Sequence, residues 1–143
     1  MKKQILLTIG LFLQITSSFA QKSENFLFEP NMMHPQQFQS RIVSPGYYMK
    51  CQNDTIECHL PYMGVAYSAP LDSDGLLFTA PIQNWNVKEG KKGKRILTFE
   101  TSKNAMECFR VQLIIFSNGN ADLRLRPSNA QSISYSGHWD NLR

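Results

Sequence analysis

Cysteine and histidine are the residues best suited to nucleophilic chemistry or metal binding in this sequence, which contains three of each. Cys51 and Cys58 flank a turn at Asn53 and Asp54, and Cys108 stands alone. If Asn53 and Asp54 form a two-residue turn, the flanking thiols are diagonal neighbours on one face of a hairpin. If the turn lies one residue later, the thiols stand directly opposite and a Cys51–Cys58 disulfide becomes feasible. Free thiols and a disulfide both stay open, and the odd count leaves at least one thiol unpaired.

These residues form no pattern typical of a metal site or a catalytic site. Cys58 and His59 are adjacent, so in a strand they point to opposite faces and cannot both bind an ion held by Cys51. His34, His59 and His138 stand outside any recognised motif, and the sequence has no Gly-x-Ser-x-Gly element. The sequence therefore predicts no catalytic residue, no metal site and no cofactor. The alternative is a hydrolase whose serine or cysteine meets a histidine only in the folded chain.

Residues 1–20 have the features of a secretory signal peptide. Lys2 and Lys3 precede an apolar run over residues 5–15, and Ala20 ends a small-residue cleavage site. The run is too short to span a membrane, which takes about 20 apolar residues. We therefore expect cleavage after Ala20 and an exported protein, periplasmic or extracellular, that does not span the membrane.

Residues 21–143 are expected to form a single all-β domain. Short apolar and aromatic runs alternate with Gly, Asn, Asp and Pro, and no helical period is visible. The short, regular spacing of these runs favours an antiparallel meander. The expected strands cover residues 25–29, 47–51, 55–60, 76–79, 82–88, 94–101, 107–116, 120–126 and 131–137. The segment over residues 30–45, polar and punctuated by proline, is expected to be a loop or a short helix.

The clearest predicted turn lies at Asn118 and Gly119, because Asn-Gly is typical of a two-residue type I′ turn. Such a turn pairs Phe116 with Ala121, and alternate positions from there would face the core. Either arginine stems, the N-terminal segment or a partner would then have to cover the aliphatic residues of the opposite face. That face would carry Val111, Leu113 and Ile115 beside Asp122, Arg124 and Arg126.

The positive charge of the chain is concentrated around one expected hairpin tip. The full sequence has a net charge of +4, but Lys2 and Lys3 would leave with the signal peptide. The basic residues of the hairpin over residues 87–99 are Lys88, Lys91, Lys92, Lys94 and Arg95. Because only Trp85 lies nearby as an aromatic partner, the cluster is not typical of nucleic-acid binding. The tip is either simply solvated or binds acidic envelope polysaccharide or lipid headgroups.

Three segments of the sequence match one family pattern in order and spacing. The matching residues are Leu60, Pro61, Tyr62, Gly64, Ala66 and Tyr67, then Asn118 and Gly119, then Ser134, Tyr135 and Gly137. In these segments the chain resembles the small secreted bacterial proteins of the domain of unknown function 4251 family, although Val65 stands where that pattern usually has Arg. The resemblance implies a lipocalin-like closed β-barrel and no known activity.

These observations predict a non-enzymatic, exported, lipocalin-like antiparallel up-and-down β-barrel. Its ligand would be a small apolar molecule inside the barrel or an envelope component at the rim. The residues expected at the ligand site or rim are Tyr62, Tyr67, Trp85, Phe116 and Tyr135. Two structural alternatives stay open. Aromatic side chains could fill the interior themselves, and residues 60–67 could form a structural cap.

Overall fold

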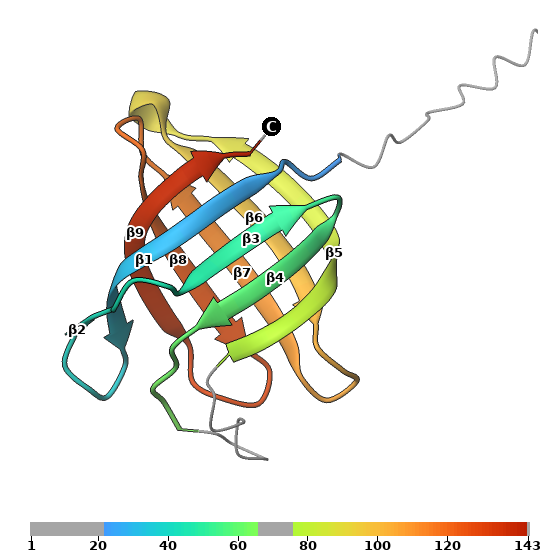
Figure 1. Ribbon diagram of the computed structural model, residues 1–143. Helices are drawn as coiled ribbons and strands as arrows, with labels where there is room; N and C mark the ends of the chain where they lie inside the picture. Colours follow the sequence, from blue (N-terminus) through green and yellow to red (C-terminus); the bar gives the residue numbers. More distant parts are fainter. Residues whose placement is uncertain (1–21, 66–75, 143) are drawn as a thin grey trace, which may run out of the picture.

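The computed structural model describes residues 22–65 and 76–142, whose strands form a closed barrel (Figure 1). Strands β1 and β3 to β9 pair antiparallel in chain order, and pairing of β1 with β9 closes the sheet, while the short β2 lies along β1. The strands are β1 (Phe26–Pro35), β2 (Arg41–Ile42), β3 (Tyr48–Gln52), β4 (Thr55–Leu60), β5 (Leu76–Glu89), β6 (Arg95–Ser102), β7 (Cys108–Ile115), β8 (Asn120–Pro127) and β9 (Ile133–Asn141). The expected all-β up-and-down barrel is confirmed.

Helical structure is almost absent from the residues that the structure describes. It consists there of one 3-10 turn, η1 (Lys91–Gly93), at the tip of the β5–β6 hairpin. No helix in this part of the chain is long and apolar enough to cross a membrane. The expected signal peptide, residues 1–20, lies outside the described residues.

Side chains alternate between the interior and the outer face of the barrel, as the two-residue period of a strand requires. In β8, Leu123 and Leu125 are fully buried whereas Arg124 and Arg126 are exposed. Burial of each such large apolar side chain stabilises the fold by about 1.5–3 kcal/mol. The core also includes Phe26, Phe28, Met49, Ile56, Leu60, Phe78, Leu97, Phe99, Phe109, Val111, Leu113 and Tyr135.

The turn between β7 and β8 differs by one residue from the expected turn. Ile115, not Phe116, pairs with Ala121. Residues 117–119 form a three-residue loop in which the amide of Gly119 donates to the carbonyl of Phe116 at 3.1 Å. Within this loop only Gly119 has a positive φ, 88°, whereas a type I′ turn needs two such residues. The Asn-Gly pair thus forms part of a three-residue hairpin loop with glycine at the positive-φ position, which is also a common type.

The shift by one residue exchanges the two faces of β7. The aliphatic side chains expected on the outer face, Val111, Leu113 and Ile115, lie in the core with at most 6% exposure. The expectation that arginine stems or another segment cover them is therefore wrong. The type I′ geometry occurs instead between β3 and β4, where Asn53 and Asp54 have φ values of 52° and 57°.

Two segments that contain proline are strands where breaks were expected. The loop or helix expected over residues 30–45 is wrong, because β1 continues to Pro35 and β2 follows. A bulge between Pro30 and Met32 lets the strand continue by leaving one residue unpaired. Likewise β5 runs unbroken through the exposed Pro81, with its bulge between Gln83 and Asn86. In β5, Pro81 itself pairs with Thr55 of β4, so this proline does not interrupt the strand.

Candidate functional site

The barrel has two structurally different ends (Figure 1). We call the end that carries residues 60–65 and 128–132 the lower end. We call the end that carries the β5–β6 and β7–β8 turns the upper end. The candidate residues divide between these ends and the interior.

Two tyrosine hydroxyls of the family motif bind the chain's own backbone at the lower end. Tyr135 is fully buried, and its hydroxyl donates to the carbonyl of Pro61 at 2.5 Å. Burial raises the pKa of Tyr135 well above the usual value. The hydroxyl of Tyr62 donates to the carbonyl of Gln131 at 2.8 Å. These contacts tie the segment after β4 to the segment before β9.

The backbone continues this tie beyond Tyr62. The amide of Val65 donates to Oε1 of Gln131 at 3.1 Å, and the amide of Gln131 donates to the carbonyl of Val65 at 3.0 Å. Gly64 allows the tyrosine ring to lie close, since a Cβ there would be 2.4 Å from the Tyr62 hydroxyl oxygen. Residues 60–65 thus have the features of a structural cap.

The other family-motif residues lie apart from this cap. Asn118 and Gly119 form the upper-end turn between β7 and β8. Ser134 and Gly137 pair with β8 and β1 inside the sheet. Ala66 and Tyr67, the latter a predicted rim residue, lie outside the described residues.

Aromatic side chains fill the interior near the upper end. Phe26 lies between Trp85 and Trp139, with ring centroids 6.5 Å from each, and Trp85 also stacks on Phe99 at 5.8 Å. Deeper in the barrel, Phe78 and Phe109 stack at 4.8 Å. Four pockets lined by described residues, of about 260–490 Å³, include exposed side chains and open to solvent. Trp85 is therefore part of a packed aromatic layer.

Phe116 lies in a different place from the other predicted aromatic residues. It lines a surface groove of about 490 Å³ between the tips of the β5–β6 and β7–β8 hairpins. The Nζ atom of Lys94 is 5.5 Å from the centre of the Phe116 ring. We call this pocket the tip groove, and its lining residues are Lys91, Lys92, Lys94, Phe116, Ser117 and Asn118.

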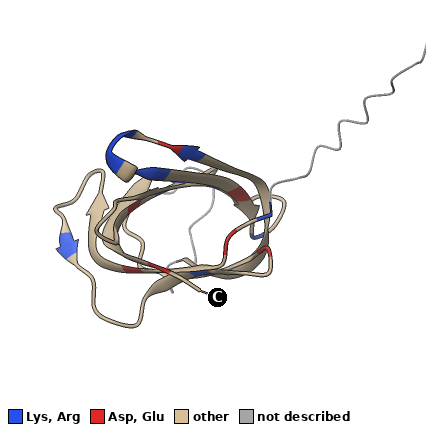
Figure 2. Ribbon diagram, turned by 90° about the horizontal axis from the view of Figure 1, so that it is seen from above, with Lys and Arg blue, Asp and Glu red and all other residues tan. Residues whose placement is uncertain are grey.

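The tip groove contains positive charge that the other described side chains leave without an ion-pair partner. None of its lining residues is acidic. Among the described residues, the ion pairs of basic side chains involve Arg95 with Glu24, Lys103 with Glu107, Arg110 with Glu100 and His138 with Asp140. The three lysines of the groove form no ion pair within this part of the chain. Figure 2 shows the resulting concentration of Lys and Arg at the β5–β6 tip.

The strand register decides between the two arrangements of Cys51 and Cys58. Cys51 pairs with Ile56 and Cys58 pairs with Met49, so the thiols are diagonal rather than opposite. Both are free and fully buried. Burial raises the pKa of Cys51 to about 11 and raises that of Cys58 further. The disulfide alternative does not fit this register, because diagonal residues are separated by more than a disulfide spans.

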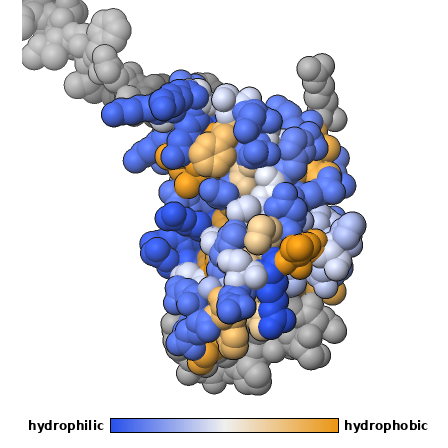
Figure 3. Space-filling model, turned by 90° about the vertical axis from the view of Figure 1, so that its left-hand side faces the viewer, coloured by the Kyte–Doolittle hydropathy of each residue, from blue (hydrophilic) through white to orange (hydrophobic). Residues whose placement is uncertain are grey.

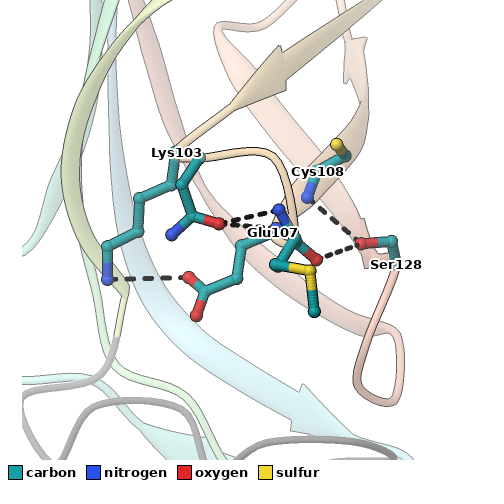
Figure 4. Close-up of polar contacts among 6 residues, drawn as sticks. Lys103, Glu107, Cys108 and Ser128 are labelled. Atoms are coloured by element: carbon teal, nitrogen blue, oxygen red, sulfur yellow. Dashed lines mark hydrogen bonds and ion pairs between the residues drawn. The ribbon is translucent and has the colours of Figure 1, made fainter.

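Cys108 is a third free thiol and is exposed at the lower end. Figure 4 shows the turn before it, in which Lys103 and Glu107 form an ion pair of 3.6 Å. The amide of Cys108 donates to the hydroxyl of Ser128 at 3.1 Å. The side-chain hydroxyl of Ser102 lies 3.3 Å from the sulfur. The surroundings of Cys108 are therefore those of an ordered surface turn.

The three histidines lie far apart in the sheet, and one of them contacts serine hydroxyls. The ring nitrogens of His34 lie 2.7 Å from Oγ of Ser40 and 2.8 Å from Oγ of Ser136. His59 packs on tyrosine rings, and His138 lies 3.3 Å from a carboxylate oxygen at the exposed end of β9. In the described residues, no three His, Cys, Asp or Glu side chains gather closely enough to hold a metal ion.

Sequence reasoning identified the tip lysines and Phe116 separately but did not place them together. The signal was present, because in an up-and-down barrel every second turn lies at the same end. The turns at residues 90–94 and 117–119 must therefore be neighbours. Trp139 and Gln131 were missed, and no pattern in their local sequence distinguishes them.

Comparisons with known proteins agree with the barrel. The family model for a domain of unknown function, DUF4251, matches residues 17–139. The crystal structure of a DUF4251 family protein from Bacteroides eggerthii DSM 20697 superposes with a TM-score of 0.63 over 82% of this chain and 80% of that chain, at 15% sequence identity. No curated protein matches the sequence.

Proposed function

We propose that this chain, which belongs to the DUF4251 family, is an exported, non-enzymatic barrel that binds a cell-envelope component at its upper end. The observation that carries the proposal is the contrast between aromatic rings stacked inside the barrel and a surface groove whose lysines form no ion pair among the described residues. A carrier of apolar molecules needs an enclosed apolar cavity. Here the stacked rings of Phe26, Trp85 and Trp139 occupy the corresponding space.

The lower end offers less to a partner than the upper end. There the polar groups of the family motif bind one another, as in the contact of Tyr135 with Pro61. A partner that used the same groups would first have to break these buried hydrogen bonds, at about 1–3 kcal/mol for each group left unsatisfied. A partner that binds the lysines of the upper end would not have to break buried hydrogen bonds.

Co-sedimentation tests the proposal. The protein purified from the cell that produces it is mixed with protease-treated envelopes of the same organism. We expect it to sediment with the envelopes and to be released by salt, and native mass spectrometry should give the mass of the polypeptide alone. Protein that stays in the supernatant contradicts envelope binding. A stoichiometric small apolar molecule in the native mass spectrum would instead identify a carrier.

A hydrolase is the second candidate, and it is supported by the contact of His34 with Ser136. A histidine within hydrogen-bond reach of a serine can act as a general base. The other ring nitrogen of His34 faces the hydroxyl of Ser40 rather than a carboxylate, so the third member of a catalytic triad is not in place. Turnover of chromogenic esters that is lost in Ser136→Ala but kept in Ser134→Ala would support this candidate. Equal activity in both variants and the parent would contradict it.

A further inference from the structure

We infer that the tip groove binds an acidic polysaccharide, with its lysines on the anionic groups and Phe116 against a sugar ring. The inference rests on the proposed function and names the class of its ligand. It begins with the construction of the groove from two hairpins. A Cβ placed on Gly93 would lie 3.7 Å from Cβ of Ser117, so the two tips are in contact. The groove between them, of about 490 Å³, has the size of a small-ligand site.

The backbone holds the lysines of the groove in position. The amide of Gly90 donates to the carbonyl of Lys94 at 2.7 Å, and the amide of Lys94 donates to the carbonyl of Lys91 at 3.3 Å. Lys92 occupies the left-handed region at φ 62° and ψ 37°. A turn closed by two internal hydrogen bonds loses less conformational entropy when it binds a ligand than a flexible loop does.

The chemistry of the groove fits a ligand that combines an anionic group with a ring. Lysine is a compact point charge without the planar fork with which arginine selects bidentate partners. The three lysines therefore favour negative charge without a strong choice between carboxylate, sulfate and phosphate. Phe116 adds an apolar surface beside these charges. A charged sugar offers the matching combination of an apolar ring face and an anionic group.

A membrane surface fits the same end less well. Phe116 is the one large apolar side chain among the lining residues of the tip groove, and it is half-buried, with Nζ of Lys94 5.5 Å from the centre of its ring, so little apolar surface is available to enter a bilayer. Among the described residues, the exposed large apolar side chains lie away from the groove, toward the lower half of the barrel: Phe38, Ile42, Val65, Leu77 and Met106. Figure 3 shows one flank of the molecule, on which apolar atoms are scattered among hydrophilic ones rather than gathered into a patch.

Calorimetric titration with defined glycans tests the inference. The probes are oligogalacturonate, sulfated dextran and neutral dextran, with anionic phospholipid vesicles as a separate arm. We expect both acidic glycans to bind, the affinity to fall as salt rises, and neutral dextran not to bind. The combined variant Lys91→Gln, Lys92→Gln and Lys94→Gln should lose about 10- to 100-fold in affinity, as three exposed charge contacts would supply.

Two matched variants separate the groove from charge in general. Arg110→Gln, Arg124→Gln and Arg126→Gln together remove the same charge from exposed positions outside the groove, and this variant should bind within about twofold of the parent, since charges beyond about 10 Å are screened at ordinary salt. Phe116→Leu should weaken binding of the glycans but not of inorganic phosphate. Both lysine and arginine variants should keep the circular dichroism and thermal midpoint of the parent, because five of the six side chains are exposed and the sixth, Lys94, is only half-buried.

The outcomes distinguish this inference from the proposed function. If the parent and the lysine variant sediment equally with envelopes, the tip groove is not the binding site although envelope binding stands. If acidic glycans bind through the lysines but envelopes do not sediment the protein, the envelope proposal fails and the groove stands. Vesicles that bind as tightly as the glycans, with the same dependence on the lysines, would overturn the polysaccharide in favour of a membrane.

Discussion

The two ends of the barrel are stabilised by different kinds of interaction. At the lower end, hydroxyls and amides bind carbonyls of the same chain, as Tyr135 does with Pro61 and Tyr62 with Gln131. At the upper end, stacked aromatic rings lie beneath exposed charges, and the ion pair of Arg95 with Glu24 is about one-third exposed on each side chain. Buried hydrogen bonds are costly to leave unmade, whereas exposed ion pairs contribute little.

The difference indicates which end is free to bind. A polar group that already has a buried partner contributes to stability and offers little to a ligand. The three lysines of the tip groove form no ion pair among the described residues, so a ligand's charge can approach them without displacing an internal carboxylate. The family motif at the lower end therefore belongs to the fold, and the four predictions below test that assignment.

The largest effect is expected from Leu60→Ala, since Leu60 is fully buried where β4 ends at the cap. Truncation of a buried leucine should cost about 2–5 kcal/mol of unfolding free energy, measured by urea denaturation. Leu77→Ala is the matched control. Leu77 belongs to the neighbouring strand at the same end but is 54% exposed, and its loss should change stability by less than about 0.5 kcal/mol. Equal losses in the two variants would remove the evidence for a tightly packed lower end.

Stability is next expected to fall in alkaline solution. The pKa of Cys51 is raised to about 11 and that of Cys58 is raised further, in both cases by burial. Because an unfolded thiol ionises near pH 8.5, each thiol's contribution is complete below that pH and is lost as the pH rises toward the folded value. The loss should reach about 1.4 kcal/mol per thiol for each pH unit.

Urea midpoints at pH 8 and pH 10 measure this loss. Cys51→Ala and Cys58→Ala should each reduce the pH dependence, whereas Cys108→Ala, at an exposed position, should leave it unchanged. An unfolding free energy that is the same at both pH values would contradict burial of the two thiols. Alkylation gives a second measurement, in which the native protein reacts at Cys108 and the unfolded protein reacts at all three cysteines.

A smaller effect is expected from Tyr135→Phe, which removes only a hydroxyl. The carbonyl of Pro61 would lose its buried donor, at a cost of about 1–3 kcal/mol. Tyr48→Phe provides the control, because its hydroxyl binds Glu57 at the exposed surface and its loss should have less effect. Thermal unfolding of the two variants compares them directly. If Tyr48→Phe were the more damaging change, the hydroxyls of the lower end would not be what holds the cap.

The sequence predicts the order and most bounds of the strands but not the pairing register of every hairpin, which decides the face that points inward. In β8 the alternation of Leu123 and Leu125 with arginines leaves one choice of inner face. In β7 Arg110 and Gln112 lie on the outer face, so the alternation alone indicates the correct inner face. The assumed length of the Asn118-Gly119 turn was given more weight and selected the wrong one. Bulges, such as the one after Pro30, arise from pairing with distant strands, and the local sequence shows only a proline.

The candidate site was predictable in its parts and not in its assembly. The lysines stand out as charge, and Phe116 stands out as an aromatic residue, but their contact depends on two turns that are distant in sequence. The packing of Trp85 on Phe26 similarly depends on closure of the barrel. Residue type predicted aromatic bulk that could line a pocket, and only the fold shows which of these rings stack on one another.

The smallest effect is expected at the ion pair of Arg95 with Glu24. The coupling free energy of this pair measures how strongly the side chains of the upper end stabilise the closed barrel. Arg95 also lies over the ring of Trp139, 5.8 Å from its centre. A double-mutant cycle with Arg95→Gln and Glu24→Gln should give a coupling of about 0.2–1 kcal/mol that decreases as salt rises. A coupling as large as the cost of Tyr135→Phe, and insensitive to salt, would mean that the upper end is as firmly closed as the lower one. The three groove lysines alone would then distinguish the upper end as the binding end.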